Sequence, residues 1–335
     1  MEIDQLITKL KNKESLNINQ TKFLFNKIMN GEIDDDKISK ILIGLAEKGE
    51  NSDEITGGAS VLREKSLKVK ISSEALDMCG TGGDGKHTLN ISTAASIVLA
   101  SLGIKVAKHG NKGLTSKCGS ADVLEKLGIN INKNPEAVAS DIENKNFGFM
   151  FAPIYHETMK KVAKIRKELK RRTIFNLLGP LCNPASVKNQ CIGIFSKDLL
   201  PLYAESLIKL KTNNAWVYHS QDGLDEISIF DKTDVLEIKN NSIKKFTINP
   251  NDFINQKFKF EEIIGGDANF NASKIIDLFK GQNGAFLEIV SLNCAAGLLV
   301  MNKNDNLKNA YQEVKNYILS GSVLKTLESL RSWAF

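Results

Sequence analysis

Residues 77–93, with the sequence DMCGTGGDGKHTLNIST, constrain the fold more than any other stretch of the chain. A short apolar run at 75–78 predicts a strand before this stretch, and helical spacing over 92–102 predicts a helix after it. The glycines of GTGGDG lack a Cβ, so the backbone can turn sharply and bring its N–H groups close to a ligand. Since the N–H groups at a helix start also attract anions, the stretch predicts a βα unit that cradles phosphate. A purely structural tight turn is the alternative, because the pattern is neither a Walker A loop nor GxGxxG.

Strand and helix patterns alternate through the chain after residue 75. Candidate strands lie at 75–78, 105–107, 148–151, 191–195, 215–218 and 235–238. Helical patterns such as 199–209 lie between most of them. This alternation predicts an α/β fold, with a large lobe whose mostly parallel central sheet is flanked by helices.

The chain before about residue 65 shows helical patterns only, with clear start signals. Asn17 and Asn51 begin two capping-box patterns, and Asp34 is a third N-cap candidate. A chain of 335 residues is also longer than one core usually grows. We therefore expect residues 1–70 to form a small all-helical lobe, joined by helices within 165–188, and residues 71–164 and 189–335 to form the α/β lobe.

Composition narrows the class of protein. The net charge of +6 is mild and its Lys and Arg are scattered, which disfavours a nucleic-acid partner. The five cysteines show no CxxC motif and fit reduced thiols in a cytoplasmic protein. No apolar run predicts a signal peptide or a membrane span, so no membrane partner is expected.

A second loop rich in donors, residues 108–128, again follows a predicted strand. Its sequence, KHGNKGLTSKCGSADVLEKLG, combines cationic and hydroxyl side chains with Gly110, Gly113 and Gly119. Such donors suit a multiply phosphorylated ligand. A solvated surface turn is the alternative interpretation, and two such loops in consecutive βα units make it the weaker one.

Several ordered motifs resemble one family, that of anthranilate phosphoribosyltransferase. They are GTGGDG with NIST, KHGN…TS…GSAD, FMFAPIYHETMKKV (149–162), RKEL..RTIFNLLGPLCNPA (166–185), DGLDEIS (222–228) and LNCAA (292–296). The resemblance covers nearly the whole chain. It implies a glycosyltransferase of tryptophan biosynthesis that moves the phosphoribosyl group of 5-phosphoribosyl 1-pyrophosphate onto the amine of anthranilate. It also implies two Mg²⁺ ions and a homodimer formed through the helical lobe.

The resemblance also implies the site residues. Those expected to bind substrate are Gly80, Gly83, Asp84, Thr88, Asn90, Ile91, Ser92, Thr93, Lys108, His109, Gly110, Asn111, Lys112, Gly113, Leu114, Thr115, Ser116, Ser120 and Arg166. Of these, Arg166, His109 and Lys108 are the expected catalytic residues, with Arg166 and Asn111 on anthranilate. The expected magnesium ligands are Ser92, Asp225 and Glu226.

The chemistry agrees with these residue types. Pyrophosphate leaves with several negative charges, which Mg²⁺ on hard oxygen ligands neutralises best. Arg166 can fork onto the carboxylate of anthranilate. The alternatives are a solvated acid pair in a turn and a surface charge on a basic helix.

Five positions depart from the pattern expected of the family: Lys112, Thr115, Cys118, Lys170 and Gln221. Lys112 keeps the charge of the expected Arg but loses its bidentate geometry. Two other functions stay open. A pyrimidine nucleoside phosphorylase would share the fold, and the basic segment 160–172 would suit a nucleic-acid-binding relative without activity.

Overall fold

The computed structural model describes residues 2–113 and 117–331. Four helices open the chain: α1 (Ile3–Lys11), α2 (Ile18–Asn30), α3 (Asp35–Lys48) and α4 (Ser52–Lys65). Asn17 and Asn51 form complete capping boxes, and the Asp34 side chain accepts from the N–H of Lys37. The predicted helix starts are thus confirmed, since each N-cap oxygen satisfies a backbone donor that the helix itself leaves unpaired.

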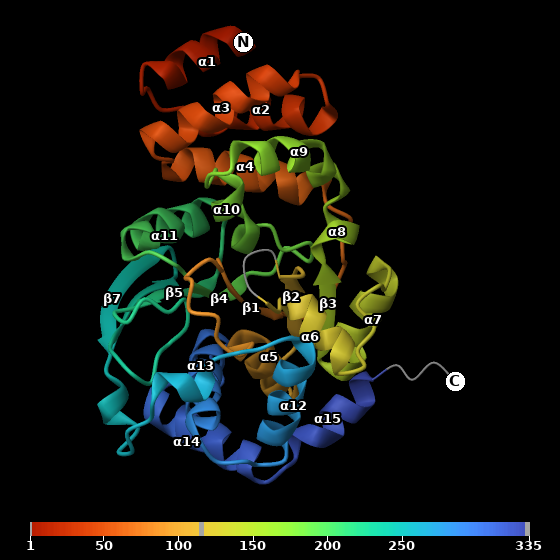
Figure 1. Cartoon of the computed structure of the whole chain (residues 1–335), viewed down its shortest axis with the longest axis vertical. Helices are drawn as coiled ribbons and strands as arrows, with labels where there is room; N and C mark the ends of the chain where they lie inside the picture. Colours follow the sequence, from red (N-terminus) through yellow and green to blue (C-terminus); the bar gives the residue numbers. More distant parts are fainter. Residues whose placement is uncertain (1, 114–116, 332–335) are drawn as a thin grey trace.

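These helices form one body with a later segment of the chain. Helix α9 (Lys160–Leu169) contacts α2 and α3, and its Val162 and Ile165 are buried with Leu24 and Phe25 of α2. Figure 1 shows α9 lying against the first helices, above the sheet. Residues far apart in the sequence therefore share the same apolar core.

A seven-stranded sheet forms the centre of the rest, in the order β3-β2-β1-β4-β5-β6-β7. Its strands are β1 (Leu76–Gly80), β2 (Val106–Gly110), β3 (Phe147–Phe151), β4 (Asn189–Gly193), β5 (Asn214–Ser220), β6 (Thr233–Lys239) and β7 (Ser242–Ile248). The first five are parallel, and β6 and β7 are antiparallel. All six predicted strands are present, and β7 was not predicted.

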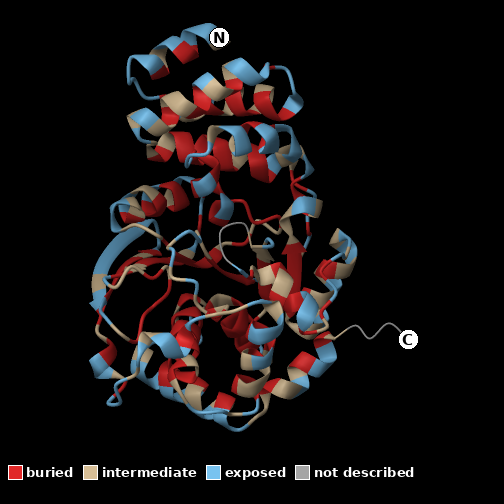
Figure 2. Cartoon of the chain, viewed as in Figure 1, coloured by how far each residue is buried: buried red, intermediate tan, exposed pale blue. Residues whose placement is uncertain are grey.

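Strand β7 escaped prediction because it is an exposed edge. Most of its side chains face solvent, so its hydrophobic pattern is weak, and Figure 2 shows it largely pale blue beside the buried central strands. Asn240 and Asn241, both with positive φ, make the two-residue turn before it. An Asn pair between two strand-like runs is the signal that sequence reasoning overlooked.

Helices cover both faces of the sheet. On one face α5 (Ile91–Ser101) and α13 (Ala285–Val300) contact each other and the central strands. On the other face α11 (Leu200–Lys209) contacts β5, β6 and α4, so that face shares its apolar cluster with the helical body. The remaining helices are α6 (Ser120–Lys126), α7 (Pro135–Lys145), α8 (Ala152–Tyr155), α10 (Phe175–Leu178), α12 (Ala268–Phe279), α14 (Leu307–Leu319) and α15 (Val323–Leu330). No helix in the described part of the chain combines the length and apolarity needed to cross a membrane.

The strand order places a switch point beside β1. The chain runs outward through β2 and β3 on one side of β1, and through β4 and β5 on the other. In open parallel sheets, ligands bind outside the carboxyl ends of the strands at this point. The loops after β1, β2, β4 and β5 therefore meet at one edge of the sheet.

Candidate active site

The glycine loop lies at the switch point, between β1 and α5. Gly82, Gly83 and Gly85 have φ of +63°, +75° and +73°, a region that other residues rarely adopt. The Thr81 hydroxyl accepts from the N–H of Phe195 at 2.9 Å, which ties the start of the loop to the end of β4. Because Gly83 needs its positive φ, an alanine there would strain the backbone as well as crowd a ligand.

Asp225 and Glu226 reach this loop from the segment between β5 and β6. The Asp225 carboxylate accepts from the N–H of Gly82 at 2.8 Å, and Glu226 accepts from the N–H of Ser92 at 3.2 Å. A Cβ at Gly80 would collide with the Asp225 carboxylate. The acid pair thus contacts both the loop and the first turn of α5.

Burial sets the charge of this pair. Burial, with the neighbouring carboxyl of Asp84, raises the pKa of Asp225 to about 7. Burial and then Asp225 raise the pKa of Glu226 well above its usual value, and its second carboxyl oxygen has no partner among the described residues. Glu226 is buried and Asp225 is half-buried, which disfavours the alternative of a fully solvated acid pair. The two carboxyls, with one Glu226 oxygen left without a partner among the described residues, supply hard oxygens of the kind that Mg²⁺ prefers.

Lys108 lies beneath this cluster rather than on the loop surface. Its side chain extends from β2 and is 1% exposed. The ammonium donates to the Met78 carbonyl and to the Ser92 hydroxyl, the latter at 3.3 Å. Burial lowers its pKa, while nearby acids including Glu226 oppose that shift. Lys108 is therefore a buried cation that contacts Ser92, in the first turn of α5, beside the predicted phosphate cradle.

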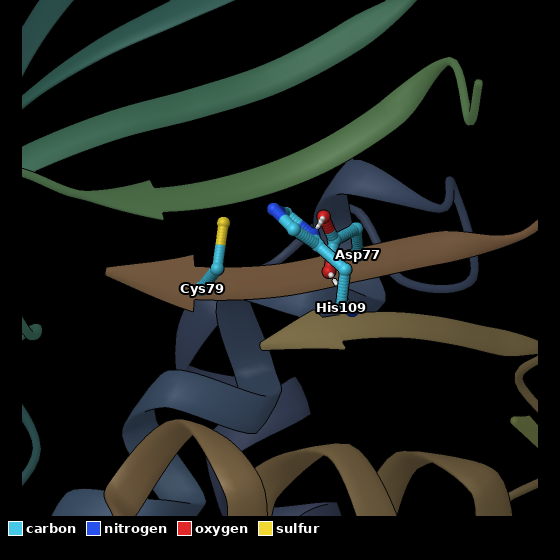
Figure 3. Close-up of side chains that lie close together, drawn as sticks. All are labelled: Asp77, Cys79 and His109. Atoms are coloured by element: carbon cyan, nitrogen blue, oxygen red, sulfur yellow. Dashed lines mark hydrogen bonds and ion pairs between the residues drawn. The ribbon is translucent and has the colours of Figure 1, made fainter. Parts of the chain in front are cut away.

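His109, the next residue of β2, forms hydrogen bonds through both of its ring nitrogens, and Figure 3 shows it beside Asp77. Its Nδ1 bonds Asp77 Oδ2 at 2.7 Å and its Nε2 bonds the Gly179 carbonyl at 2.8 Å. A carboxylate and a carbonyl only accept, so each ring nitrogen carries a proton and the ring is an imidazolium. Burial alone would lower the pKa of His109, but the neighbouring Asp77 carboxylate outweighs burial and raises it. Burial alone would raise the pKa of Asp77, but the His109 charge outweighs burial and lowers it.

Cys79 lies beside this pair, on the same face of β1 as Asp77 (Figure 3). One ligand atom from each of Asp77, Cys79 and His109 lies within 4.8 Å of the others. Burial raises the pKa of the Cys79 thiol well above its usual value, and both nitrogens of His109 are already bonded. The cluster is thus occupied with its own hydrogen bonds, unlike the acid pair.

Three side chains fasten the turn that follows α10. His109 bonds Gly179, which begins a 3₁₀ turn, His156 bonds the Cys182 carbonyl at 2.9 Å, and Asn183 donates to the Ala107 carbonyl at 2.8 Å. Burial lowers the pKa of His156 to about 4, so its Nε2 donates as a neutral ring. The turn is therefore fixed to β2.

Arg166 lies on α9 with its guanidinium 5.5 Å from the centre of the Phe175 ring. Burial lowers its pKa, and it forms no ion pair with the described residues. Lys164, two residues earlier, is exposed and lies near Asp35 and Glu168. The contrast favours a ligand-binding role for Arg166 over the surface-charge alternative.

The other predicted residues fall into three groups. Asn90 lies among site loops, accepting from Asn271 at 2.8 Å and donating to the Cys118 carbonyl, and Thr88 pairs with Ile264. Ile91 and Thr93 are buried. Gly110, the last residue of β2, lies against the Ser120 side chain. In the loop that follows, the Asn111 carbonyl accepts from the Ser120 hydroxyl and the Gly113 N–H donates to Asp122. Lys112 forms an ion pair with Glu125.

Leu114, Thr115 and Ser116, which were also predicted to bind substrate, lie outside the described residues. Two residues that contact the site were not singled out: Asp77 and Arg172. Asp77 stands two positions before Cys79 on β1, and its burial on a central strand was the available signal. The Lys170 departure has a visible cost, because Lys170 adopts φ of +48° after α9, where glycine is favoured.

A glycine loop with buried acids at the switch point of a parallel sheet defines a class of enzymes that act on phosphorylated sugars. Comparison with known families agrees. A model described as "Glycosyl transferase family, a/b domain" matches residues 72–324, and one described as "Glycosyl transferase family, helical bundle domain" matches residues 4–66.

Individual relatives narrow the class. Anthranilate phosphoribosyltransferase of Pelagibacter ubique is 48% identical over 326 residues, covering 97% of this chain and 98% of the relative. That of Clostridium kluyveri is 43% identical over 99% of both chains. The chain belongs to the anthranilate phosphoribosyltransferase family.

Solved structures agree in fold. The anthranilate phosphoribosyltransferase of Thermus thermophilus matches with a TM-score of 0.91 at 34% identity, covering 97% of this chain and 99% of that one. The Saccharomyces cerevisiae enzyme in complex with PRPP and Mg matches with a TM-score of 0.90 at 28% identity, covering 98% and 96%. The same enzyme in complex with 4-fluoroanthranilate matches with a TM-score of 0.87 at 26% identity, covering 98% and 97%.

Proposed function

We propose that this protein transfers the phosphoribosyl group of 5-phosphoribosyl 1-pyrophosphate to the amine of anthranilate. The products are N-(5-phosphoribosyl)anthranilate and pyrophosphate, in a step of tryptophan biosynthesis. The observation that carries the proposal is the acid pair against the glycine loop, in which the buried Glu226 has one carboxyl oxygen without a partner among the described residues. A yeast relative bound to PRPP and Mg, and to 4-fluoroanthranilate, supports it.

Two Mg²⁺ ions are expected at Asp225, Glu226 and the Ser92 hydroxyl. The bonds of Asp225 to the Gly82 N–H and of Glu226 to the Ser92 N–H hold the two acids against the glycine loop and the first turn of α5, which supports this assignment. When bound, the metal neutralises the charge that grows on the departing pyrophosphate. Asp84, whose carboxyl lies beside Asp225, is a further oxygen for this group.

The chain's own residues bind and orient the two substrates. The remaining N–H groups of the glycine loop and of the first turn of α5 donate to the phosphates, while Lys108 adds positive charge from below. Arg166 holds the carboxylate of anthranilate, together with Asn111. His109 has no free lone pair, so we assign it to positioning the Gly179 turn rather than to removing the proton of the amine.

We further propose that residues 1–70, with helices within 165–188, form a lobe distinct from 71–164 and 189–335, which bind phosphoribosyl pyrophosphate. Because α9 begins at Lys160 and its Val162 packs with α2, the helical lobe takes in α9 from its first residue. A homodimer through the helical lobe, in the cytoplasm, completes the proposal. The match of a separate helical bundle model to residues 4–66 supports the division. Sedimentation of the wild-type chain at several concentrations tests the dimer, which predicts twice the mass of 37.0 kDa.

A fluorescence assay of anthranilate consumption tests the activity. We expect consumption to require both phosphoribosyl pyrophosphate and magnesium. Phosphorolysis of a pyrimidine nucleoside without magnesium would favour the phosphorylase instead. A salt-sensitive DNA complex without any transfer would favour the nucleic-acid-binding relative.

A further inference from the structure

Arg172 joins the segment between α9 and α10 to the glycine loop. Its guanidinium donates to the Gly83 carbonyl at 2.7 Å and lies 3.7 Å from the centre of the Phe195 ring. The side chain is exposed, yet it forms no ion pair with the described residues. Its neighbour Arg171 instead pairs with Glu47 of α3 at 3.3 Å.

The glycine loop has few contacts that hold its shape. A Cβ placed at Gly82 or Gly85 would meet nothing within 4 Å, so the loop lies in open space there. Between Gly82 and Lys86, the backbone of the described loop is held by the Gly82 N–H to Asp225, the Gly83 carbonyl to Arg172, and the Lys86 N–H to Asp84. The Asp84 carboxyl also lies beside Asp225, and the Lys86 ammonium lies over the Phe260 ring. Glycines lose the most conformational freedom on ordering, so such a loop needs external contacts.

The Arg172 contact orients one peptide group in particular. In a planar trans peptide the carbonyl and the following N–H point in opposite directions. With the Gly83 carbonyl directed at Arg172, the N–H of Asp84 must point away from Arg172. That N–H belongs to the loop that we propose as the phosphate cradle.

Phe195 completes this arrangement. Its own N–H donates to the Thr81 hydroxyl at 2.9 Å, so the ring that supports Arg172 is tied to the start of the same loop. A planar guanidinium can stack on a ring and donate from its edge at once, whereas an ammonium cannot. The site therefore uses the shape of arginine as well as its charge.

We propose that Arg172 is a positioning residue for phosphoribosyl pyrophosphate, which presets the Gly83–Asp84 peptide so that its N–H faces the phosphates. This inference rests on the proposed function. Losing the contact leaves the loop to be ordered by the substrate itself, which weakens binding. Once the substrate is bound and the loop ordered, the chemical step proceeds as before.

The test compares Arg172→Ala, Arg172→Lys and Phe195→Leu, with Arg171→Ala as the matched control. We expect the KM for phosphoribosyl pyrophosphate to rise about tenfold in Arg172→Ala, with kcat within about twofold and the anthranilate KM unchanged. Arg172→Lys should behave nearly as Arg172→Ala does. Phe195→Leu should raise the same KM, and combined with Arg172→Ala it should add little. Arg171→Ala should match the wild type.

Two results would overturn the proposal. Wild-type kinetics in Arg172→Lys would mean that a point charge on the phosphates, not the shape of arginine, is what matters. A fall in kcat with an unchanged KM would place Arg172 in the chemical step. Hydrogen exchange of amides 82–86 in the ligand-free variants, expected to speed up in Arg172→Ala, tests the positioning even if the wild type shows no transferase activity.

Discussion

Two clusters of ionisable groups lie beside β1, and they differ in how their charge is balanced. In the first, Asp77 and His109 neutralise each other, and the second N–H of the His109 ring donates to the Gly179 carbonyl. In the second, Asp84, Asp225 and Glu226 gather like charges, and a Glu226 oxygen stays unpaired. The first cluster is balanced within the protein, so removing one partner should destabilise the fold, whereas the second is the one that we propose a bound cation balances.

Removing one partner of the balanced cluster should have the largest effect. Asp77→Asn leaves the buried His109 charge without its partner, which typically costs about 3–5 kcal/mol of unfolding free energy. Urea titration with circular dichroism measures this. Asp36→Asn, which breaks an exposed pair with Lys40, is the control and should cost under about 1 kcal/mol. A loss as small as the control's would show that the first cluster does not stabilise the fold.

The pH dependence of this loss sharpens the comparison. The lowered pKa of Asp77 stabilises the fold above the ordinary aspartate value, and this contribution is lost as pH falls through the lowered pKa. The raised pKa of His109 stabilises the fold below the ordinary histidine value, and this contribution is lost as pH rises through the raised pKa. The difference between wild type and Asp77→Asn should thus be greatest between about pH 4 and 6.5 and shrink toward pH 9. A difference that grows toward pH 9 would contradict the imidazolium.

Neutralising the unbalanced cluster should instead affect catalysis. Asp225→Asn with Glu226→Gln keeps the shape but removes the negative charge that would hold the metal, so kcat should fall at least about 10²–10³-fold. Because the pKa values of both acids are raised, the ligand-free wild type loses stability as pH rises from the ordinary carboxyl value toward the raised values. The variant lacks these acids and should melt at a higher temperature than wild type at pH 8. Asp231→Asn, in the same loop, is the control. Near-normal kcat in the double variant would contradict the metal assignment.

Arg166 carries a positive charge and forms no ion pair with the described residues, in contrast to Lys164 on the same helix. Arg166→Ala should reduce kcat/KM for anthranilate by about 2–4 kcal/mol, because charge-assisted bonds to its carboxylate are lost. The KM for phosphoribosyl pyrophosphate should barely change. Lys164→Ala, on the exposed side of the same helix, is the control. Steady-state kinetics in both substrates decides, and equal weakening of the two would move Arg166 out of the anthranilate site.

Features that depend on neighbouring residues could be predicted from the sequence, whereas features that depend on distant contacts could not. Helix starts and the central strands were predictable, because a capping residue such as Asn17 or an apolar run such as that of β1 acts locally. The edge strand β7 was not, since its exposed residues carry little pattern. The acid pair was recognisable as a motif, but its burial was not, because burial comes from loops that meet only in the fold.

The contacts of Arg172 and His109 lay further beyond sequence reasoning. Arg172 stands in a run of basic residues, and nothing in that run distinguishes it from Arg171, which turns toward the helical body. The protonation of His109 depends on Asp77 and Gly179, which stand 32 residues before it and 70 residues after it. Because these partners are distant from His109 in the sequence, its charge state could be assigned only from the structure.

Magnesium binding to the ligand-free protein tests the central claim most directly. If the unbalanced acid cluster is the metal site, Mg²⁺ must displace the protons that burial retains on Asp225 and Glu226. Calorimetric titration in two buffers of different ionisation enthalpy should then show proton release near pH 6.5, with affinity rising up to about tenfold per pH unit for each proton displaced. Asp225→Asn with Glu226→Gln should abolish both. Binding of equal strength at pH 6.5 and 8, without proton release, would contradict the account.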